Sequence, residues 1–218
     1  MMQKTGILCA CEKELKPFLA NMQNIITTEY GMHIFHSGEL KGVSVVAVYS
    51  GCGKINAAIT AQQLIDEFNV DSIIFSGIAG SMTKDVGIFD TVVCTSSEFR
   101  DTDNDIYSDF PVMESPVFYA DPSLLNIARR AAKQVDWKIH FGLTTTGDIF
   151  TKNISPNALC IDMETAAAAH ACYMCKIPFI AIRSISDGHS EQGQEAIQRN
   201  FDKAALQSYR FVEMMMKT

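Results

Sequence analysis

The sequence predicts a single α/β domain with a central mixed, mostly parallel sheet and helices on both faces. Short β-branched runs alternate along the chain with helical stretches of roughly 10–20 residues, an order that is typical of α/β folds. The chain has 218 residues, of which 47% are hydrophobic, and this is enough to bury one sizeable core. No internal repeat or low-complexity run divides the chain, so we assign residues 1–218 to one domain.

The predicted strands are short apolar or β-branched runs that end at glycines or polar residues. The first of them is followed at once by a helical stretch, and two others are joined by a turn at Glu39–Gly42. In chain order the predicted strands are Gly6–Cys11, Met32–Ser37, Val43–Tyr49, Ser72–Ser76, Thr91–Thr95, His140–Thr145 and Phe179–Ile185.

The predicted helices have apolar residues at helical spacing, and Asp121 before Pro122 is a suitable N-cap. In chain order these helices are Glu12–Met22, Asn56–Phe68, Pro122–Val135, Asp162–Cys175 and Gln194–Met216. The segment Phe99–Ala120 has no clear period, and a loop of about twenty residues is usually functional or disordered.

Composition argues against several classes of protein. The formal net charge is −7 and the basic residues are scattered, whereas a nucleic-acid-binding protein normally has a basic stripe. No apolar run approaches the roughly 18 residues that span a bilayer. The N-terminal stretch lacks the features of a signal peptide. We therefore expect a cytoplasmic protein with neither nucleic-acid nor membrane partners.

The cysteines and histidines predict no metal site and no cofactor. Seven cysteines are an odd number, and reduced thiols are expected in the cytoplasm. Cys172 and Cys175 form a C-x-x-C pair without a second pair, inside an Ala-rich helix, so we expect packing residues there. His170 and His189 are expected to be a packed helix residue and a loop residue.

Four polar features follow predicted strands: Glu12 with Glu14, Gly51–Lys54, Gly77–Ser81, and Asp187. Ligands of open α/β sheets bind at the carboxyl ends of strands, so we expect these features to converge. Gly51–Lys54 lacks the spacing and the Ser or Thr of a phosphate-binding Walker loop, and is better interpreted as a tight corner near a sugar.

Two carboxylates stand out beside buried segments. Asp187 ends a buried strand before Gly188, where a simple turn residue is the alternative. Glu164 lies in the first turn of a predicted helix that Asp162 caps. The positive helix terminus favours the ionised form of Glu164, and a partly buried carboxylate there requires a ligand or partner.

Six motifs occur in a shared order from about residue 5 to residue 190: GILCACEKELKPFL, SGCGKINAA, SGIAGS, TTGDIF, IDMETAA and RSISD. In this order they resemble the nucleoside phosphorylase/nucleosidase superfamily, and most closely the bacterial 5′-methylthioadenosine/S-adenosylhomocysteine nucleosidases. The resemblance implies the α/β fold of that superfamily, hydrolysis of an adenine nucleoside, no cofactor and a homodimer.

The resemblance also implies the roles of individual residues. Glu14 would activate the attacking water, and aligning the family's Glu-rich stretch through Gly6 selects Glu14 over Glu12. Asp187 would hydrogen-bond the adenine and protonate its N7 as the base leaves. The substrate-binding residues it implies are Glu164 on the ribose hydroxyls, the Met163 backbone beside it, Phe150 and Thr151 at the purine, Ile78 and Gly80 of SGIAGS, and Phe201 over the base.

These residue types suit the chemistry. Cleavage of an N-ribosyl bond builds an oxocarbenium-like centre and leaves charge on the base, so it needs an acid at the base and a base at the water. Asp187 must be protonated near neutral pH, which burial favours, while Glu14 must stay ionised.

Three alternatives remain open. A phosphorylase would hold phosphate with arginines, but the loop ACEKEL after the first strand has none and carries Glu14. A hydrolase of 6-amino-6-deoxyfutalosine would share the adenine end. A ligand-binding module without catalysis would never release adenine.

The 5′ substituent is the least determined feature. Ile78 stands where the nucleosidases often carry Ser, and DTDNDIYSDFPVMES replaces their usual 5′-pocket stretch. We expect this segment to supply apolar groups to the 5′ pocket, and its acidic residues to disfavour an anionic substituent. The apolar residues are Ile106, Phe110, Pro111, Val112 and Met113, and the acids are Asp101, Asp103, Asp105, Asp109 and Glu114.

Overall fold

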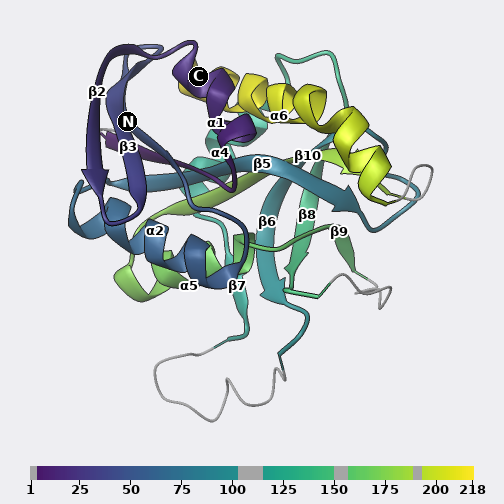
Figure 1. Cartoon of the computed structure of the whole chain (residues 1–218). Helices are drawn as coiled ribbons and strands as arrows, with labels where there is room; N and C mark the ends of the chain where they lie inside the picture. Colours follow the sequence, from purple (N-terminus) through teal and green to yellow (C-terminus); the bar gives the residue numbers. More distant parts are fainter. Residues whose placement is uncertain (1–3, 103–114, 150–156, 189–192) are drawn as a thin grey trace.

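The computed structural model describes residues 4–102, 115–149, 157–188 and 193–218 (Figure 1). Its strands form one mixed sheet in the order β10-β6-β8-β9-β5-β1-β4-β3-β2, and β7 pairs with β6. The strands are β1 (Lys4–Cys9), β2 (Gln23–Tyr30), β3 (His33–Leu40), β4 (Val43–Tyr49), β5 (Ser72–Ser81), β6 (Thr91–Phe99), β7 (Val117–Tyr119), β8 (Ile139–Thr146), β9 (Ala158–Asp162) and β10 (Phe179–Asp187).

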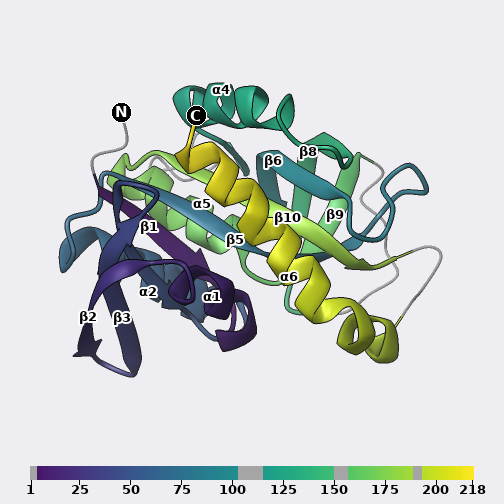
Figure 2. The same ribbon diagram turned by 90° about the horizontal axis from the view of Figure 1, so that it is seen from above.

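Helices cover both faces of the sheet, as the sequence predicted (Figures 1 and 2). Helices α2 (Lys54–Asp66) and α5 (Thr165–Cys175) pack in one hydrophobic cluster. Helices α1 (Glu12–Leu19), α4 (Pro122–Ala132) and α6 (Gln194–Met216) pack in the other. Asp121 caps α4 as expected, since its side chain accepts hydrogen bonds from the backbone N–H groups of Ser123 and Leu124.

The sheet combines parallel and antiparallel pairs, and β8 pairs in parallel with both β6 and β9. β1 pairs in parallel with β4 and β5, and β5 pairs in parallel with β10. The β2–β3 and β3–β4 pairs are antiparallel, as are those of β5 with β9, β6 with β7 and β10 with β6. The sheet is therefore mixed, with more antiparallel pairing than the sequence suggested.

Three strands escaped the sequence analysis for physical reasons. β2 is exposed at every residue, so it has none of the apolar alternation by which strands are detected. β7 and β9 are short, with three and five residues. β7 also lies within the segment Phe99–Ala120, whose sequence shows no clear period.

The extended central strands bring the polar motifs together. β5 continues through SGIAGS to Ser81 and β10 continues to Asp187, so both motifs are strand residues and not turns. In the parallel β5–β10 register, Arg183 is opposite Gly77 and Asp187 is opposite Gly80. No helix of the described ranges is long and apolar enough to cross a membrane.

Candidate active site

Glu14 is a buried carboxylate in the first turn of α1, directly after β1. Its Oε2 accepts hydrogen bonds from the backbone N–H groups of Ala10 (2.7 Å) and Cys11 (3.2 Å), and its Oε1 accepts one from Ile78 (2.8 Å). Burial raises the pKa of Glu14, against the opposing effects of Arg183 and these three N–H groups. Glu12, by contrast, is exposed to solvent.

Arg183 is fully buried in the middle of β10. Its Nε donates to Asp162 Oδ2 (2.9 Å), its Nη2 donates to Thr165 Oγ1 (2.8 Å), and its guanidinium lies 4.1 Å from the Phe75 ring centroid. Within the described part of the chain, Nη1 is buried without a hydrogen-bond partner. A buried cationic donor without a protein partner is normally satisfied by a water or a small polar ligand.

Gly77 brings Arg183 and Glu14 together. A Cβ at Gly77 would lie 2.4 Å from Arg183 Nη1 and 2.5 Å from Glu14 Oε1. The two charged groups therefore converge on the same point of β5, with no side chain between them. Only glycine lets the two side chains come this close to the β5 backbone, since the Cβ of any other residue would lie within 3.0 Å of nonbonded heavy atoms, a distance that real Cβ atoms essentially never show.

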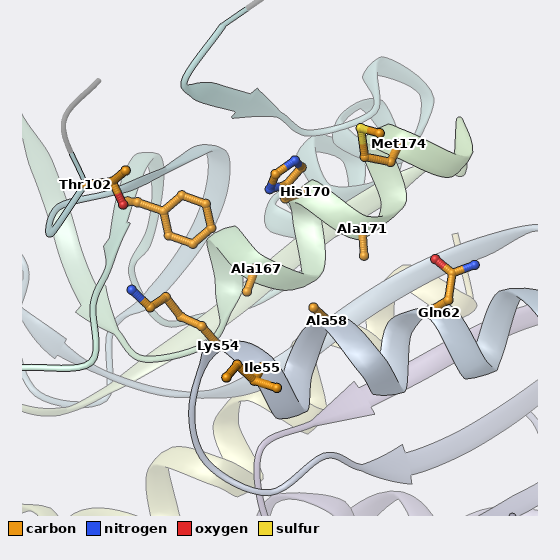
Figure 3. A pocket seen from close by; sticks show the side chains of 10 residues that line it. Lys54, Ile55, Ala58, Gln62, Thr102, Ala167, His170, Ala171 and Met174 are labelled. Atoms are coloured by element: carbon orange, nitrogen blue, oxygen red, sulfur yellow. The ribbon is translucent and has the colours of Figure 1, made fainter. Parts of the chain in front are cut away.

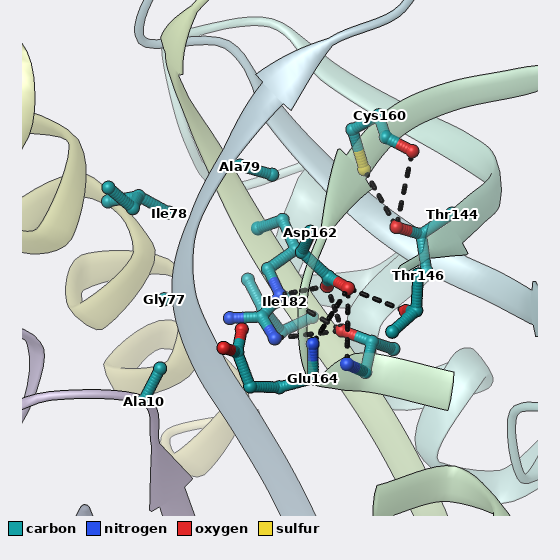
Figure 4. A network of polar contacts seen from close by, with 12 residues as sticks. Ala10, Gly77, Ile78, Ala79, Thr144, Thr146, Cys160, Asp162, Glu164 and Ile182 are labelled. Carbon is teal, nitrogen blue, oxygen red and sulfur yellow. Dashed lines mark hydrogen bonds and ion pairs between the residues drawn. The ribbon is translucent and has the colours of Figure 1, made fainter. Parts of the chain in front are cut away.

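Asp162 is the centre of a buried network at the end of β9 (Figure 4). Its Oδ1 accepts hydrogen bonds from Thr146 Oγ1 (2.6 Å) and from the backbone N–H groups of Glu164 (3.3 Å) and Thr165 (3.1 Å). Its Oδ2 accepts from Thr165 Oγ1 and Arg183 Nε. Asp162 thus meets the start of α5 as predicted, although it belongs to a strand and not to the helix.

Glu164 is the N-cap residue of α5 and is 5% exposed. Its Oε1 accepts a hydrogen bond from Gly53 N–H (2.8 Å), which places the Gly51–Lys54 corner beside it. Burial and the neighbouring Asp162 carboxylate raise the pKa of Glu164. Burial and Asp162 therefore oppose the stabilising effect that the helix terminus was expected to have on the ionised form of Glu164.

The thiol of Cys52 and the thioether of Met163 lie against each other beside this carboxylate, with a distance of 3.6 Å between Sγ and Sδ. Burial and Glu164 raise the pKa of Cys52 to about 11. At neutral pH this thiol is therefore protonated, and the two sulfur groups form an uncharged wall.

Asp187 ends β10 and is 6% exposed. Ser186 Oγ donates to its Oδ1 (2.8 Å), and burial raises the pKa of the Asp187 carboxyl against this hydrogen bond. Asn200 of α6 donates to the Ser186 carbonyl (2.9 Å) and holds α6 against this end of β10. Phe201 follows Asn200 and is half-buried, with Lys13 Nζ 5.3 Å from its ring centroid.

The structure thus brings together Glu14, Ile78, Gly80, Met163, Glu164 and Asp187 around the ends of β1, β5, β9 and β10. Phe150 and Thr151 lie outside the described residues, as do residues 103–114 of the expected 5′ segment and His189. Within the described ranges, no group of three His, Cys, Asp or Glu side chains is placed to hold a metal ion.

A separate cavity of about 480 Å³ lies between α2 and α5 (Figure 3). None of the four site carboxylates, Glu14, Asp162, Glu164 and Asp187, lines it. Its walls include Ile55, Phe99 and Met174, and Ile55 is 75% exposed. The cavity is therefore an apolar surface feature beside the carboxylate cluster. His170 also lines it, stacked on Phe118 with 4.8 Å between ring centroids.

Comparison with known proteins identifies the family. The sequence profile described as the Phosphorylase superfamily matches residues 4–217. A 5′-methylthioadenosine/S-adenosylhomocysteine nucleosidase from Maridesulfovibrio salexigens is 36% identical, over 98% of this chain and 99% of its own. This chain belongs to the nucleosidase family of the phosphorylase superfamily. The resemblance stated from the six motifs is confirmed.

Solved structures share the fold of this nucleosidase family member. The Colwellia psychrerythraea 5′-methylthioadenosine/S-adenosylhomocysteine nucleosidase, solved in complex with adenine, has a TM-score of 0.92 and 31% identity, with 100% of this chain and 96% of that chain covered. The futalosine hydrolase of Helicobacter pylori strain 26695 has a TM-score of 0.89 and 26% identity, with 100% and 98% covered.

The sequence analysis missed Arg183 as a member of the site, and it assigned Asp162 only to a helix cap. The available signal was the position of Arg183 within the apolar run FIAIRSIS. A charged residue that is forced into a buried strand requires a carboxylate partner, and Asp162 is that partner, with side-chain exposures of 0% and 2% for the two residues.

Proposed function

We propose that this nucleosidase hydrolyses the N-glycosidic bond of 5′-methylthioadenosine and S-adenosylhomocysteine, releasing adenine and the 5-thioribose sugar. The observation that carries the proposal is the convergence of buried Glu14 with Arg183 Nη1, which has no hydrogen-bond partner among the described residues, on the β5–β10 pair that also carries a second buried acid, Asp187. The names of the relatives and the adenine in the Colwellia structure support the substrate class.

Asp187 is proposed as the acid that protonates the leaving base. Its carboxyl is largely shielded from solvent and, among the described residues, accepts a hydrogen bond from the neutral hydroxyl of Ser186, and burial raises its pKa. A raised pKa keeps a larger fraction protonated near neutral pH, as a general acid requires. The proton passes from the carboxyl to N7 of adenine while the glycosidic bond breaks.

Glu14 is proposed as the base for the attacking water. Arg183 Nη1 and Glu14 Oε1 lie close together over Gly77, and one water bridging them would donate to the carboxylate and accept from the guanidinium. Because burial raises the pKa of Glu14, its carboxylate is a stronger base than an exposed Glu. The water transfers a proton to Glu14 as its oxygen bonds to the anomeric carbon.

Glu164 is proposed to hold the ribose hydroxyls. Its Oε1 accepts a hydrogen bond from Gly53 N–H, and its carboxylate lies near enough to Glu14 for the negative charge of Glu14 to contribute to its raised pKa. Negative charge beside the sugar stabilises an oxocarbenium-like centre as it develops. The sulfur wall of Cys52 and Met163 provides an uncharged surface beside Glu164.

A phosphorylase is the weaker alternative. The segment ACEKEL that follows β1 contains no arginine and carries Glu14 in the first turn of α1, so a phosphate in the proposed water position would face this carboxylate at close range. The charge of Arg183 is already balanced by its ion pair with Asp162.

A hydrolase of 6-amino-6-deoxyfutalosine is the second candidate, and the likeness to a futalosine hydrolase supports it. The substrates of the two hydrolases share the adenine nucleoside and differ in the 5′ substituent. The deciding experiment compares kcat/KM for 5′-methylthioadenosine, S-adenosylhomocysteine and 6-amino-6-deoxyfutalosine. We expect the two thioethers to be cleaved faster by at least about tenfold, and the reverse order would assign the other hydrolase.

We further propose a cytoplasmic homodimer. All seven cysteines are free thiols, which suits a reducing compartment. The surface beside the α2–α5 cavity exposes large apolar side chains, and such patches commonly mark protein interfaces. These residues are Ile55, Ile59, Tyr173 and Met174, each at least 45% exposed. Sedimentation equilibrium at several concentrations tests the dimer, and a monomer at micromolar concentration would exclude it.

A further inference from the structure

Asp162 contacts more of the buried site than any function assigned so far explains. Its two oxygens accept hydrogen bonds from two threonine hydroxyls, two backbone N–H groups and the guanidinium of Arg183. Figure 4 shows these contacts converging on Asp162 from β8 and the start of α5. This carboxylate is therefore fixed from three sides, and it transmits that fixed position to Arg183.

The hydrogen bonds that Arg183 donates determine the direction of its third side-chain nitrogen, Nη1. Nε donates to Asp162 Oδ2 (2.9 Å) and to Thr165 Oγ1 (3.1 Å), and Nη2 donates to Thr165 Oγ1 (2.8 Å). A guanidinium is planar, so fixing Nε and Nη2 also fixes the direction of Nη1. Nη1 is thereby directed over Gly77, where a Cβ would lie 2.4 Å from Nη1 and 2.5 Å from Glu14 Oε1.

We propose that Asp162 is a positioning residue for hydrolysis, which acts through Arg183 to keep Nη1 directed at the water between it and Glu14. This inference rests on the proposed function. With its charge balanced by Asp162, Arg183 holds the water without collapsing onto Glu14. Without Asp162, the guanidinium is free to form a direct ion pair with Glu14, which would make that carboxylate a weaker base.

The charges around Glu14 determine the expected direction of change. Arg183 on β10 lowers the pKa of Glu14, while Glu164 at the start of α5 and the thiols of Cys9 on β1 and Cys11 before α1 share its surroundings. Asp162→Asn removes a negative charge that balances Arg183. The pKa of Glu14 should therefore fall.

The first test is independent of activity. The side-chain carboxyls of ¹³C-labelled glutamates are titrated by NMR in the wild type and in Asp162→Asn, with Glu14→Gln assigning the resonance. We expect the Glu14 pKa to fall by about half a unit or more in Asp162→Asn. An unchanged pKa would overturn the inference whether or not the protein cleaves 5′-methylthioadenosine.

The second test is kinetic, with 5′-methylthioadenosine as the substrate. Asp162→Asn should lower kcat by about 10²-fold with KM changed less than about threefold, and the acid limb of the kcat profile should move to lower pH. Asp90→Asn is the matched control, because Asp90 is a partly buried carboxylate paired with His140 (2.9 Å) outside the site. It should keep kcat. An inactive wild type would refute the proposed function, and the NMR result would still decide the role of Asp162.

A double variant covers the case in which Asp162→Asn fails to fold. Breaking one half of a buried ion pair is strongly destabilising, whereas replacing both halves is often tolerated. If Asp162 acts through Arg183, then Asp162→Asn/Arg183→Met and Arg183→Met should have the same kcat within about threefold. A further loss of about tenfold or more in the double variant would show that Asp162 acts independently of Arg183 and would overturn the inference.

Discussion

Gly77→Ala is expected to disable the site by adding a single methyl group. The new Cβ would lie 2.4 Å from Arg183 Nη1 and 2.5 Å from Glu14 Oε1, about 1 Å inside ordinary van der Waals contact at 3.4–4 Å. Neither group has an easy way to withdraw. Arg183 is held by Asp162 and Thr165, and Glu14 is held by three backbone N–H groups.

The magnitude follows from that overlap. A misplacement of about 1 Å in a catalytic constellation costs about 10²-fold in rate, so we expect kcat/KM for 5′-methylthioadenosine to fall by about 10²-fold, or about 2.7 kcal/mol of transition-state stabilisation. Overpacking a buried site also costs about 1–3 kcal/mol of the free energy of unfolding.

Gly87→Ala is the matched control for this prediction. Its Cβ would meet only Asp90, at an ordinary 3.6 Å, and Gly87 lies outside the site. Adenine release and urea denaturation are measured for both variants and the wild type. The account of a point shared by Glu14 and Arg183 would be refuted if Gly77→Ala kept more than about a third of the wild-type kcat/KM.

Four further predictions concern the acid, the base and the substrate, and two of them use the same variant of the acid. Asp187→Asn should lower kcat by about 10²-fold or more, because an amide has no carboxyl proton to donate; near-normal turnover would remove Asp187 from its role. Since burial raises the pKa of Asp187, the same variant should have a higher Tm than the wild type at pH 8, and this gain should vanish as the pH falls through the raised pKa toward the usual Asp range. A gain that persisted in acid would show another cause. Glu14→Gln should abolish adenine release while Glu12→Gln preserves it, and the opposite result would mean that the alignment is displaced. 5′-Methylthioadenosine should exceed AMP in kcat/KM by about 10³-fold, roughly 4 kcal/mol, because the phosphate loses apolar burial and meets acidic residues; comparable values would mean that only adenine and ribose are recognised.

The sequence alone predicted the α/β layers and the convergence of the polar motifs, because both follow from hydrophobic pattern and strand ends. The distinction between Glu12 and Glu14 came from family alignment, and the structure buries only Glu14. Its role in catalysis, like those of Glu164 and Asp187, stays a prediction until the variants are measured.

The parts that the sequence did not reveal depend on long-range contacts. Asp162 and Arg183 are 21 residues apart and meet only because β9 and β10 both reach β5. The local sequence pattern placed Asp162 at a helix start and Arg183 in an apolar strand, and neither assignment reveals that the two side chains form an ion pair. The pKa of Glu164 likewise depends on burial and on Asp162, which its position at the start of a helix does not reveal.

The most direct test of the central claim is the dependence of adenine release on phosphate. The purified protein is incubated with 5′-methylthioadenosine in a phosphate-free buffer and again with increasing inorganic phosphate, and the sugar product is identified by mass spectrometry. Hydrolysis through Glu14 predicts the same rate of adenine release throughout, with free 5-methylthioribose as the sugar. Release that requires phosphate and yields a sugar 1-phosphate, or no release of adenine at all, would contradict the account.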